Sequence, residues 1–337
     1  MFDNRAAIDD VCRRFDLGTA RAAPVAVAGG LSNRLYHLVT ELGEFALKRM
    51  VANADAREFK RNVEAAFAIE RLAQAAGIAM PEPIPVAGSD EALGLITDDE
   101  GPCWVRVHRW VEASPVDPGN VELRDRAEVG AILAAMHGLP LIDNATTTPV
   151  AAGSIPDRDW TAALAAHPFA VSLAGPVSVL EEIVRRGYGH PRSGPVLSHR
   201  DLDAKNLLRD GKGRLILLDW DAAGPTDAQW DVIGVAMDWS GIREGTASSQ
   251  RFADILDGYS VAGGSVDPVT PASFAGWCEG VLDWLWFNVE RSSSTDRHER
   301  HRGELEVNDT ARFLPLAAAW ITSERYPIAA GISRIRG

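Results

Sequence analysis

One short stretch limits the folds open to this chain more than any other: the residues from His199 to Asn206, followed by Asp219. Apolar residues precede the stretch and flank an Asp-Gly-Lys-Gly turn after it, so we expect a strand, a loop and then a β-hairpin. The hairpin would place Asn206 and Asp219 side by side, and both offer the oxygen ligands that suit a hard cation such as Mg²⁺. Asp201 lies on the loop entering the hairpin, where a free carboxylate is suited to accept a hydroxyl proton.

Composition limits the class of protein and the kind of partner. The chain has 337 residues, which suits two lobes better than one compact core. Its formal net charge is −13, and it lacks the basic footprint that nucleic-acid binding requires. No run of about 18 apolar residues occurs, so we expect no membrane span. The polar N-terminus has no apolar core of a signal peptide, which leaves the cytoplasm as the expected location.

The three cysteines, Cys12, Cys103 and Cys278, are odd in number and far apart in the sequence. Their spacing fits neither a disulfide framework nor a metal site. We therefore expect them to be small buried side chains.

Hydrophobic periodicity divides the chain into a sheet-rich first part and a helix-rich second part. The first part contains one Ala- and Glu-rich helix over residues 55–77 and apolar runs that predict strands over 35–40, 45–48, 93–97 and 104–111. We therefore predict an α+β fold of two lobes. Residues 1–109 would form a small lobe with an antiparallel sheet and one helix, and residues 110–337 a larger, mainly helical lobe.

Residues 199–206 fit the H-R-D-L-x-x-x-N catalytic loop of protein kinases. The whole chain more closely resembles the aminoglycoside phosphotransferase and choline kinase family, which has a protein-kinase-like fold. That family usually carries His-Gly-Asp-Leu-His-Pro-x-Asn and then Ile-Asp-Trp or Ile-Asp-Phe, and Leu218-Asp219-Trp220 is similar to the second part. The resemblance implies that Asp201 is the catalytic base or orients the hydroxyl, and that Asn206 and Asp219 hold Mg²⁺.

The loop departs from this family at two positions. Arg200 replaces the common Gly, and Asp203 replaces the common His. A carboxylate at 203 does not neutralise the γ-phosphate. Lys205 resembles the Arg that tyrosine kinases place at that spacing, and we name it as a candidate cation for the γ-phosphate.

The first lobe should hold the nucleotide. No G-x-x-x-x-G-K-[ST] sequence is present, so a P-loop is not expected. In the loop Gly29-Gly30-Leu31-Ser32-Asn33, we expect backbone N–H groups, Ser32 and Asn33 to contact phosphate oxygens. Lys48 matches the family's lysine for the α- and β-phosphates. Such a lysine normally pairs with a glutamate of the following helix; Glu64 and Glu70 are the candidates, and we prefer Glu64.

The resemblance also implies that the strand ending near Arg109 runs into a hinge. The base of the nucleotide would then bond to backbone groups around Arg109, Trp110 and Val111. Backbone contacts leave no side-chain pattern in a sequence, so this expectation depends on the resemblance alone.

The last third of the chain should shape the acceptor site. The segment 281–291 is apolar on nearly all sides, which predicts a buried helix. Trp284 and Asn288 are four residues apart and share a face with Arg291, and similar helices of the family line the substrate cleft. Asp203, Asp238 and Trp239 are further candidates. Aromatic faces with carboxylates suit an ammonium group and also a sugar ring.

These features favour a kinase acting on a small molecule. We expect transfer of the γ-phosphate of ATP or GTP, with Mg²⁺, to a hydroxyl of an aminoglycoside-like or other antibiotic. The alternative is a metabolite kinase acting on choline, homoserine or a sugar. A protein kinase is less favoured, because no Ala-Pro-Glu sequence or activation segment follows Asp219. An inactive binding protein of this fold would be expected to have lost Asp201, Asn206, Asp219 or Lys48, and all four are present.

Overall fold

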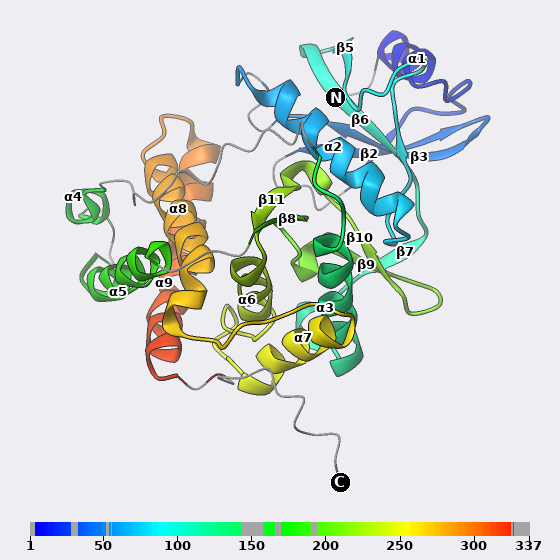
Figure 1. The fold of residues 1–337 in the computed structure, drawn as a ribbon. Helices are drawn as coiled ribbons and strands as arrows, with labels where there is room; N and C mark the ends of the chain where they lie inside the picture. Colours follow the sequence, from blue (N-terminus) through cyan, green and yellow to red (C-terminus); the bar gives the residue numbers. More distant parts are fainter. Residues whose placement is uncertain are drawn as a thin grey trace.

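The computed structural model describes residues 4–27, 33–51, 54, 56–142, 158–165, 167, 170–189, 194–324 and 326. Figure 1 shows a sheet with two helices at one end and a larger helical part at the other. The predicted α+β, two-lobed arrangement is confirmed. The three cysteines are buried and unpaired, as predicted. No helix in the described ranges is long and apolar enough to span a membrane.

The first lobe is built on an antiparallel sheet. Within the described residues, six strands pair in the order β1-β2-β3-β6-β4, with β5 also paired to β6. They are β1 (Val25–Val27), β2 (Arg34–Thr40), β3 (Gly43–Arg49), β4 (Pro83–Ile84), β5 (Gly94–Asp98) and β6 (Gly101–Arg109). Buried and more exposed side chains alternate along β2 and β3, as expected for strands with one covered face.

Two helices flank this sheet. Helix α1 (Arg5–Arg14) packs Ile8 and Val11 into the core beneath β2 and β3, and it is a helix beyond the one that we predicted for this lobe. Helix α2 (Phe59–Ala75) buries Ala66 and Ile69 against the core of the second lobe and contacts the turn that follows Asp219. Because α2 contacts both parts, its side chains can connect the sheet to the loop that carries Asp219.

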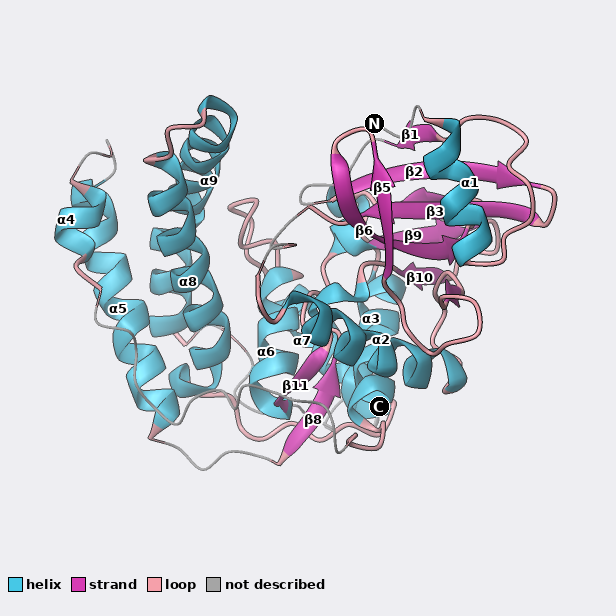
Figure 2. Cartoon of the chain, turned by 90° about the horizontal axis from the view of Figure 1, so that it is seen from above, coloured by secondary structure: helices cyan, strands magenta, loops and turns pink. Residues whose placement is uncertain are grey.

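The second lobe consists of helices around a small β-rich segment, residues 195–227, which we call the island. In the described residues these are α3 (Leu123–His137), α4 (Trp160–Leu164), α5 (Ala170–Tyr188), α6 (Ala228–Asp238), α7 (Ser249–Val261), α8 (Ala275–Ser292) and α9 (Arg297–Thr322). Figure 2 shows α4, α5, α8 and α9 as one group beside α6. Helices α3 and α7 cross closely, since a Cβ on Gly130 would lie 2.3 Å from the carbonyl oxygen of Ile255.

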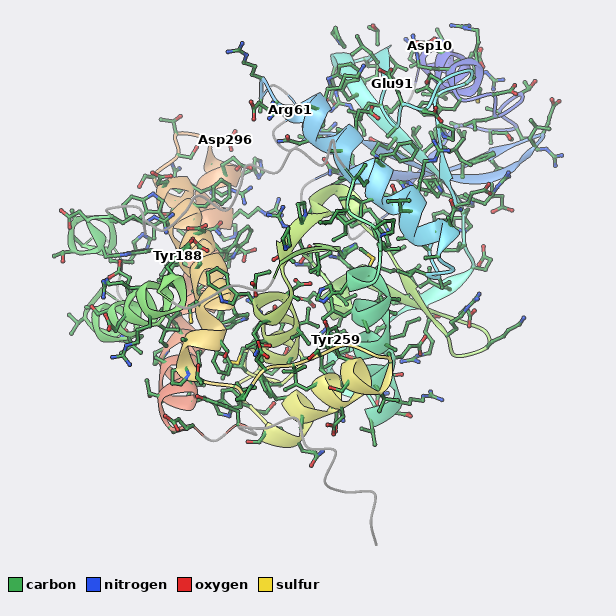
Figure 3. All side chains as sticks on the ribbon, viewed as in Figure 1. Asp10, Arg61, Glu91, Tyr188, Tyr259 and Asp296 are labelled. Carbon is green, nitrogen blue, oxygen red and sulfur yellow. The ribbon has the colours of Figure 1, made fainter. Side chains whose placement is uncertain are left out.

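A polar cluster ties α3, α6 and α7 together. His137 Nε2 lies 2.9 Å from Asp231 Oδ2, and His137 Nδ1 lies 2.8 Å from the hydroxyl of Tyr259, which is labelled in Figure 3. Asp231 therefore joins two helices, whereas the N-cap of α6 is Asp227.

The island contains the predicted hairpin, with two additional pairings. Strands β9 (Leu207–Asp210) and β10 (Leu215–Leu217) form the hairpin, and β8 (Pro195–Ser198) precedes it. Two strands that we did not predict complete it, namely β7 (Ala113–Pro115) beside β9 and β11 (Gly224–Asp227) beside β8. These strands are short and contain proline, so their sequences carry little strand signal.

Candidate active site

His199 anchors the loop that carries the candidate catalytic residues. Its side chain is fully buried, and its Nε2 lies 2.9 Å from the carbonyl oxygen of Leu218 at the end of β10. The ring also meets the edge of Trp220. Burial lowers the pKa of His199 and favours the neutral ring. This residue therefore supports the loop from within.

Two neighbours orient the carboxylate of Asp201. Asn206 Nδ2 donates to Asp201 Oδ2 over 2.8 Å and to the Asp201 carbonyl over 2.9 Å. Lys205 Nζ lies 3.0 Å from Asp201 Oδ1. The side chain of Asp201 remains 39% exposed, so a hydroxyl group can reach this oriented carboxylate.

The hairpin brings Asn206 and Asp219 to the same place. Leu207 pairs with Leu217, and the Leu218 N–H donates to the Asn206 carbonyl over 2.8 Å. Asp219 adopts a left-handed backbone conformation with a φ of 60°, and its side chain is 47% exposed.

The oxygen atoms of this pair fit Mg²⁺. Asn206 Nδ2 is committed to Asp201, which leaves its Oδ1 as a ligand beside the Asp219 carboxylate. Across the described ranges, no group of three or more His, Cys, Asp or Glu side chains is arranged to hold a metal ion. Mg²⁺ commonly takes one or two protein carboxyl or amide oxygens and completes its shell with phosphates and water. A two-ligand site is thus chemically suitable.

Lys48 on β3 points at the same loop. Its Nζ lies 2.6 Å from Asp219 Oδ1 and also binds Asp221 Oδ2. Burial favours the neutral amine, but the charges of Asp221 and Asp219 outweigh it and raise the pKa of Lys48. Asn33 joins the cluster, because its Nδ2 donates to Asp221 Oδ2 over 3.4 Å and its Oδ1 accepts from the Val51 N–H. The predicted contact of Ser32 lies outside the described residues.

The preferred pairing of Lys48 with Glu64 is wrong for this structure. The Glu64 carboxylate accepts hydrogen bonds from the backbone N–H groups of Ala92 and Leu93, at 2.8 and 3.0 Å. Glu70 is fully buried instead, where it binds Arg106 and His108. The two glutamates are six residues apart, so their side chains project about 120° apart around the helix and cannot face the same strand.

The predicted hinge differs from residue to residue in which backbone groups have a hydrogen-bond partner among the described residues. The Trp110 N–H donates to the Glu44 carbonyl, and the Trp110 indole stacks on His37 and donates to Glu112. Among the described residues, the N–H and C=O of Val111 have no hydrogen-bond partner. The Arg109 and Trp110 N–H groups are thus occupied, and Val111 is the predicted hinge residue whose N–H has no partner among the described residues.

Sequence reasoning missed Arg106 and Asp221 and gave too little weight to Glu70. These three residues form the ion pairs next to Lys48. Arg106 binds both Glu70 and Asp221, so it lies between α2 and the loop that carries Asp219 and Asp221. The available signal was Arg106 between Val105 and Val107 in the middle of a strand, together with a second aspartate two residues after Asp219.

Two carboxylates, those of Asp203 and Asp238, lie near enough to each other to interact electrostatically. Burial, and then the nearby charge of Asp238, raise the pKa of Asp203. Asp238 Oδ1 accepts hydrogen bonds from Arg243 Nε and from the Trp277 indole, each over 2.9 Å. Trp239 is buried and its indole donates to the Leu202 carbonyl, so it supports the loop from below. Asp203 and Asp238 thus form an acidic wall beside Asp201.

The candidate residues of α8 separate into exposed and buried ones. Trp284 is 42% exposed and packs on Phe287, which is 50% exposed, with ring centroids 5.9 Å apart. Asn288 is fully buried and donates to the Trp284 carbonyl, whereas Arg291 forms a two-armed ion pair with Glu299 of α9.

Our expectation that Asn288 and Arg291 line the substrate cleft is therefore corrected. Helix α9 covers this face of α8 at Gly303, where a Cβ would lie 2.8 Å from the Asn288 carbonyl oxygen. A helix that is apolar on nearly all sides gives no sequence signal for which face a neighbour covers. Of the three residues, Trp284 is the one left exposed.

We expect a measurable backbone strain at Arg200, which has a φ of 63°. A Cβ costs about 1–2 kcal/mol in this left-handed region. Arg200→Gly should therefore have a free energy of unfolding about 1 kcal/mol above that of Arg200→Ala, because both lack the guanidinium and only alanine keeps the Cβ. Urea unfolding curves measure the difference. Equal stability of the two variants would contradict strain at this position.

Comparison with known proteins places these features in a known group. A family profile described as "Phosphotransferase enzyme family" matches residues 25–264 of the chain. No curated protein sequence matches it at a significant level.

Solved structures agree with this family match at the level of the fold. A spectinomycin phosphotransferase in complex with ADP and spectinomycin superposes with a TM-score of 0.67 at 13% identity, over 94% of this chain and 98% of that one. An amicoumacin kinase in complex with AMP-PNP, Ca²⁺ and Ami gives 0.63 at 14% identity, over 92% and 94%. A microcompartment-associated aminopropanol kinase gives 0.61 at 16% identity, over 96% and 100%.

Proposed function

Since the chain belongs to the phosphotransferase enzyme family, we propose that it transfers the γ-phosphate of ATP or GTP to a hydroxyl group of an aminoglycoside-like or other antibiotic. The observation that carries the proposal is the meeting of Asp201, Asn206, Asp219 and Lys48 at one end of the hairpin, with an acidic wall alongside. A general base, two metal ligands and a phosphate-binding cation are the groups that this reaction uses.

On the acceptor side, Asp201 would orient the hydroxyl group and take its proton. Its carboxylate is held by Asn206 and Lys205 and is accessible from solvent. Lys205 is half-exposed, and its ammonium could move from Asp201 to a γ-phosphate oxygen. The contact with Asp201 would then weaken as the phosphate binds.

On the nucleotide side, Lys48 would bind the α- and β-phosphates. Asn206 and Asp219 would hold Mg²⁺, whose charge neutralises the phosphate oxygens when the ion is bound. Asn33 is placed beside Lys48 and would line the same site. The hinge groups of Val111 would bind the base.

The acidic wall favours an acceptor that carries an amino group. Arg243 forms an ion pair with Asp238. The charges of Lys205 and Arg243 also act on Asp203, but among the described residues the hydrogen bond that the Asp203 carboxylate accepts is a long one of 3.3 Å from the Lys205 N–H. A partly buried carboxylate gains most from a cation that it can contact directly. The exposed Trp284 and Phe287 would add a flat apolar surface for a ring system, which favours antibiotics over small amino alcohols.

Asp203→Asn should weaken the binding of an amino-bearing acceptor. We expect its KM to rise about ten- to a hundredfold, the worth of one hydrogen bond to a charged group, with the nucleotide KM unchanged.

In the unmodified protein the acceptor KM should fall as pH rises from acidic values, because burial and Asp238 raise the pKa of Asp203 and only its ionised form attracts a cation. Steady-state kinetics with an amine-free analogue as control measure both effects, and an equal loss with that analogue would contradict the assignment.

A panel of hydroxylated acceptors tests the proposed function. Each compound is incubated with Mg²⁺ and ATP or GTP, and mass spectrometry detects the gain of one phosphate. We expect a product from an amino-bearing antibiotic and little or none from its deaminated analogue. Products from choline, homoserine or simple sugars alone would replace the antibiotic with a metabolite as substrate.

A further inference from the structure

A series of ion pairs connects α2 to Lys48 through three other side chains. Glu70 of α2 binds the NH2 group of Arg106 on β6, and the NH1 group of Arg106 binds Asp221 Oδ1. The other oxygen of Asp221 binds Lys48. The side chains of Glu70 and Arg106 are 0% and 2% exposed, so these contacts lie in the interior.

Both oxygens of each buried carboxylate in this series have a partner. The second oxygen of Glu70 lies 2.9 Å from His108 Nε2. Both oxygens of Asp221 are occupied, whereas Asp219 contacts Lys48 through Oδ1 and remains 47% exposed. The two aspartates therefore differ in role: Asp219 can turn an oxygen to a metal ion, and Asp221 is held within the protein.

We propose that the Glu70–Arg106–Asp221 bridge positions Lys48, in place of a direct ion pair between this lysine and a glutamate of α2. The proposal rests on the proposed function, in which Lys48 binds the phosphates. Lysine carries its charge on a flexible stem, whereas the planar guanidinium of Arg106 presents donors at fixed angles to two carboxylates. Glu70 and Arg106 are thus positioning residues that act through Asp221.

Because the bridge is buried, removing one of its members is costly. Removing one member of a buried ion pair leaves its partner as an uncompensated charge in the interior. The remaining groups must then rearrange, and Asp221 is the member of the bridge that also contacts Lys48. A change at Glu70 should therefore reach the nucleotide site through the orientation of Lys48.

A double-mutant cycle tests this coupling. The affinity for AMP-PNP with Mg²⁺ is measured by calorimetry for the unmodified protein, Glu70→Gln, Lys48→Met and the combined variant. We expect Glu70→Gln to weaken binding about tenfold when Lys48 is present and less than about twofold when it is replaced, within the usual range of coupling between residues of one network. Equal losses in both backgrounds would overturn the proposal, since Glu70 would then act through stability alone.

Glu64→Gln is the matched control, because Glu64 lies on the same helix but binds the backbone of Ala92 and Leu93. Its effect on affinity should be the same in both backgrounds. Thermal unfolding identifies any variant that does not fold, and Arg106→Lys then replaces Glu70→Gln in the same cycle.

Kinetics supply a second readout. Glu70→Gln should change the nucleotide KM and kcat and leave the acceptor KM unaltered, and a parallel rise in the acceptor KM would overturn the positioning role. Failure of the unmodified protein to bind AMP-PNP would be a separate result, which removes the proposed function and the bridge's role together.

Discussion

Asp201→Asn should lower kcat by about a hundred- to ten-thousandfold, the usual contribution of a positioned general base. Asparagine keeps the size of the side chain but cannot accept the hydroxyl proton. The carboxylate is 39% exposed, and the amide oxygen of asparagine can still accept the hydrogen bond from Asn206, so we expect the free energy of unfolding to change little. Nucleotide affinity should also be unchanged, since Lys48 and Asp219 are left in place.

Steady-state kinetics, calorimetric nucleotide binding and thermal unfolding together measure this prediction. The control is Lys212→Met, which removes a lysine at the hairpin turn, away from the site. A loss of activity that follows a loss of nucleotide affinity would show that Asp201 supports the fold of the loop. It would then not be the base.

Asp219→Asn should nearly abolish phosphate transfer. We expect a fall in kcat of about a thousandfold, because metal ions commonly contribute several kcal/mol of transition-state stabilisation. The asparagine can still accept a hydrogen bond from Lys48, but it offers a neutral oxygen in place of a charged one. Lys48 also keeps Asp221, so the fold of the loop should survive.

A binding measurement separates this effect from a general loss of activity. In the unmodified protein, Mg²⁺ should tighten the binding of AMP-PNP, and in Asp219→Asn most of that gain should vanish. Asp203→Asn is the control, because it should alter the acceptor KM and keep the response to Mg²⁺. A full Mg²⁺ response in Asp219→Asn would contradict its assignment as a ligand.

The arrangement of the candidate catalytic loop could be predicted because its geometry is local. Asp201, Asn206 and Asp219 lie within one short segment, and the register of a single hairpin brings them together. The fold class followed from the same segment and from the change of periodicity after the first lobe. No distant contact had to be known.

The partner of Lys48 could not be predicted in the same way. The choice between Glu64 and Glu70 depends on how α2 is rotated against β6, and Arg106 and Asp221 enter from elements far apart in the chain. A sequence shows that a helix carries two glutamates. It does not show which of them faces the sheet.

The acceptor side was predictable only in part, for a related reason. Asp203 and Asp238 were candidates from their positions, and their proximity appears once α6 packs beside the loop. Asn288 and Arg291 were misassigned because the face of α8 that carries them is covered by α9, the helix that follows α8 in the chain. Burial of one helix by another depends on tertiary packing.

Transfer of an isotopically labelled γ-phosphate is the most direct test of the proposed reaction. The unmodified protein and Asp201→Asn are each incubated with labelled nucleotide, Mg²⁺ and the acceptor found by the panel. We predict that the label appears on a hydroxyl oxygen of the acceptor with the unmodified protein, and that the variant forms this product at least about a hundredfold more slowly. Two results would contradict the assignment of this site: label found only in free phosphate, or labelled acceptor formed at equal rates by both proteins.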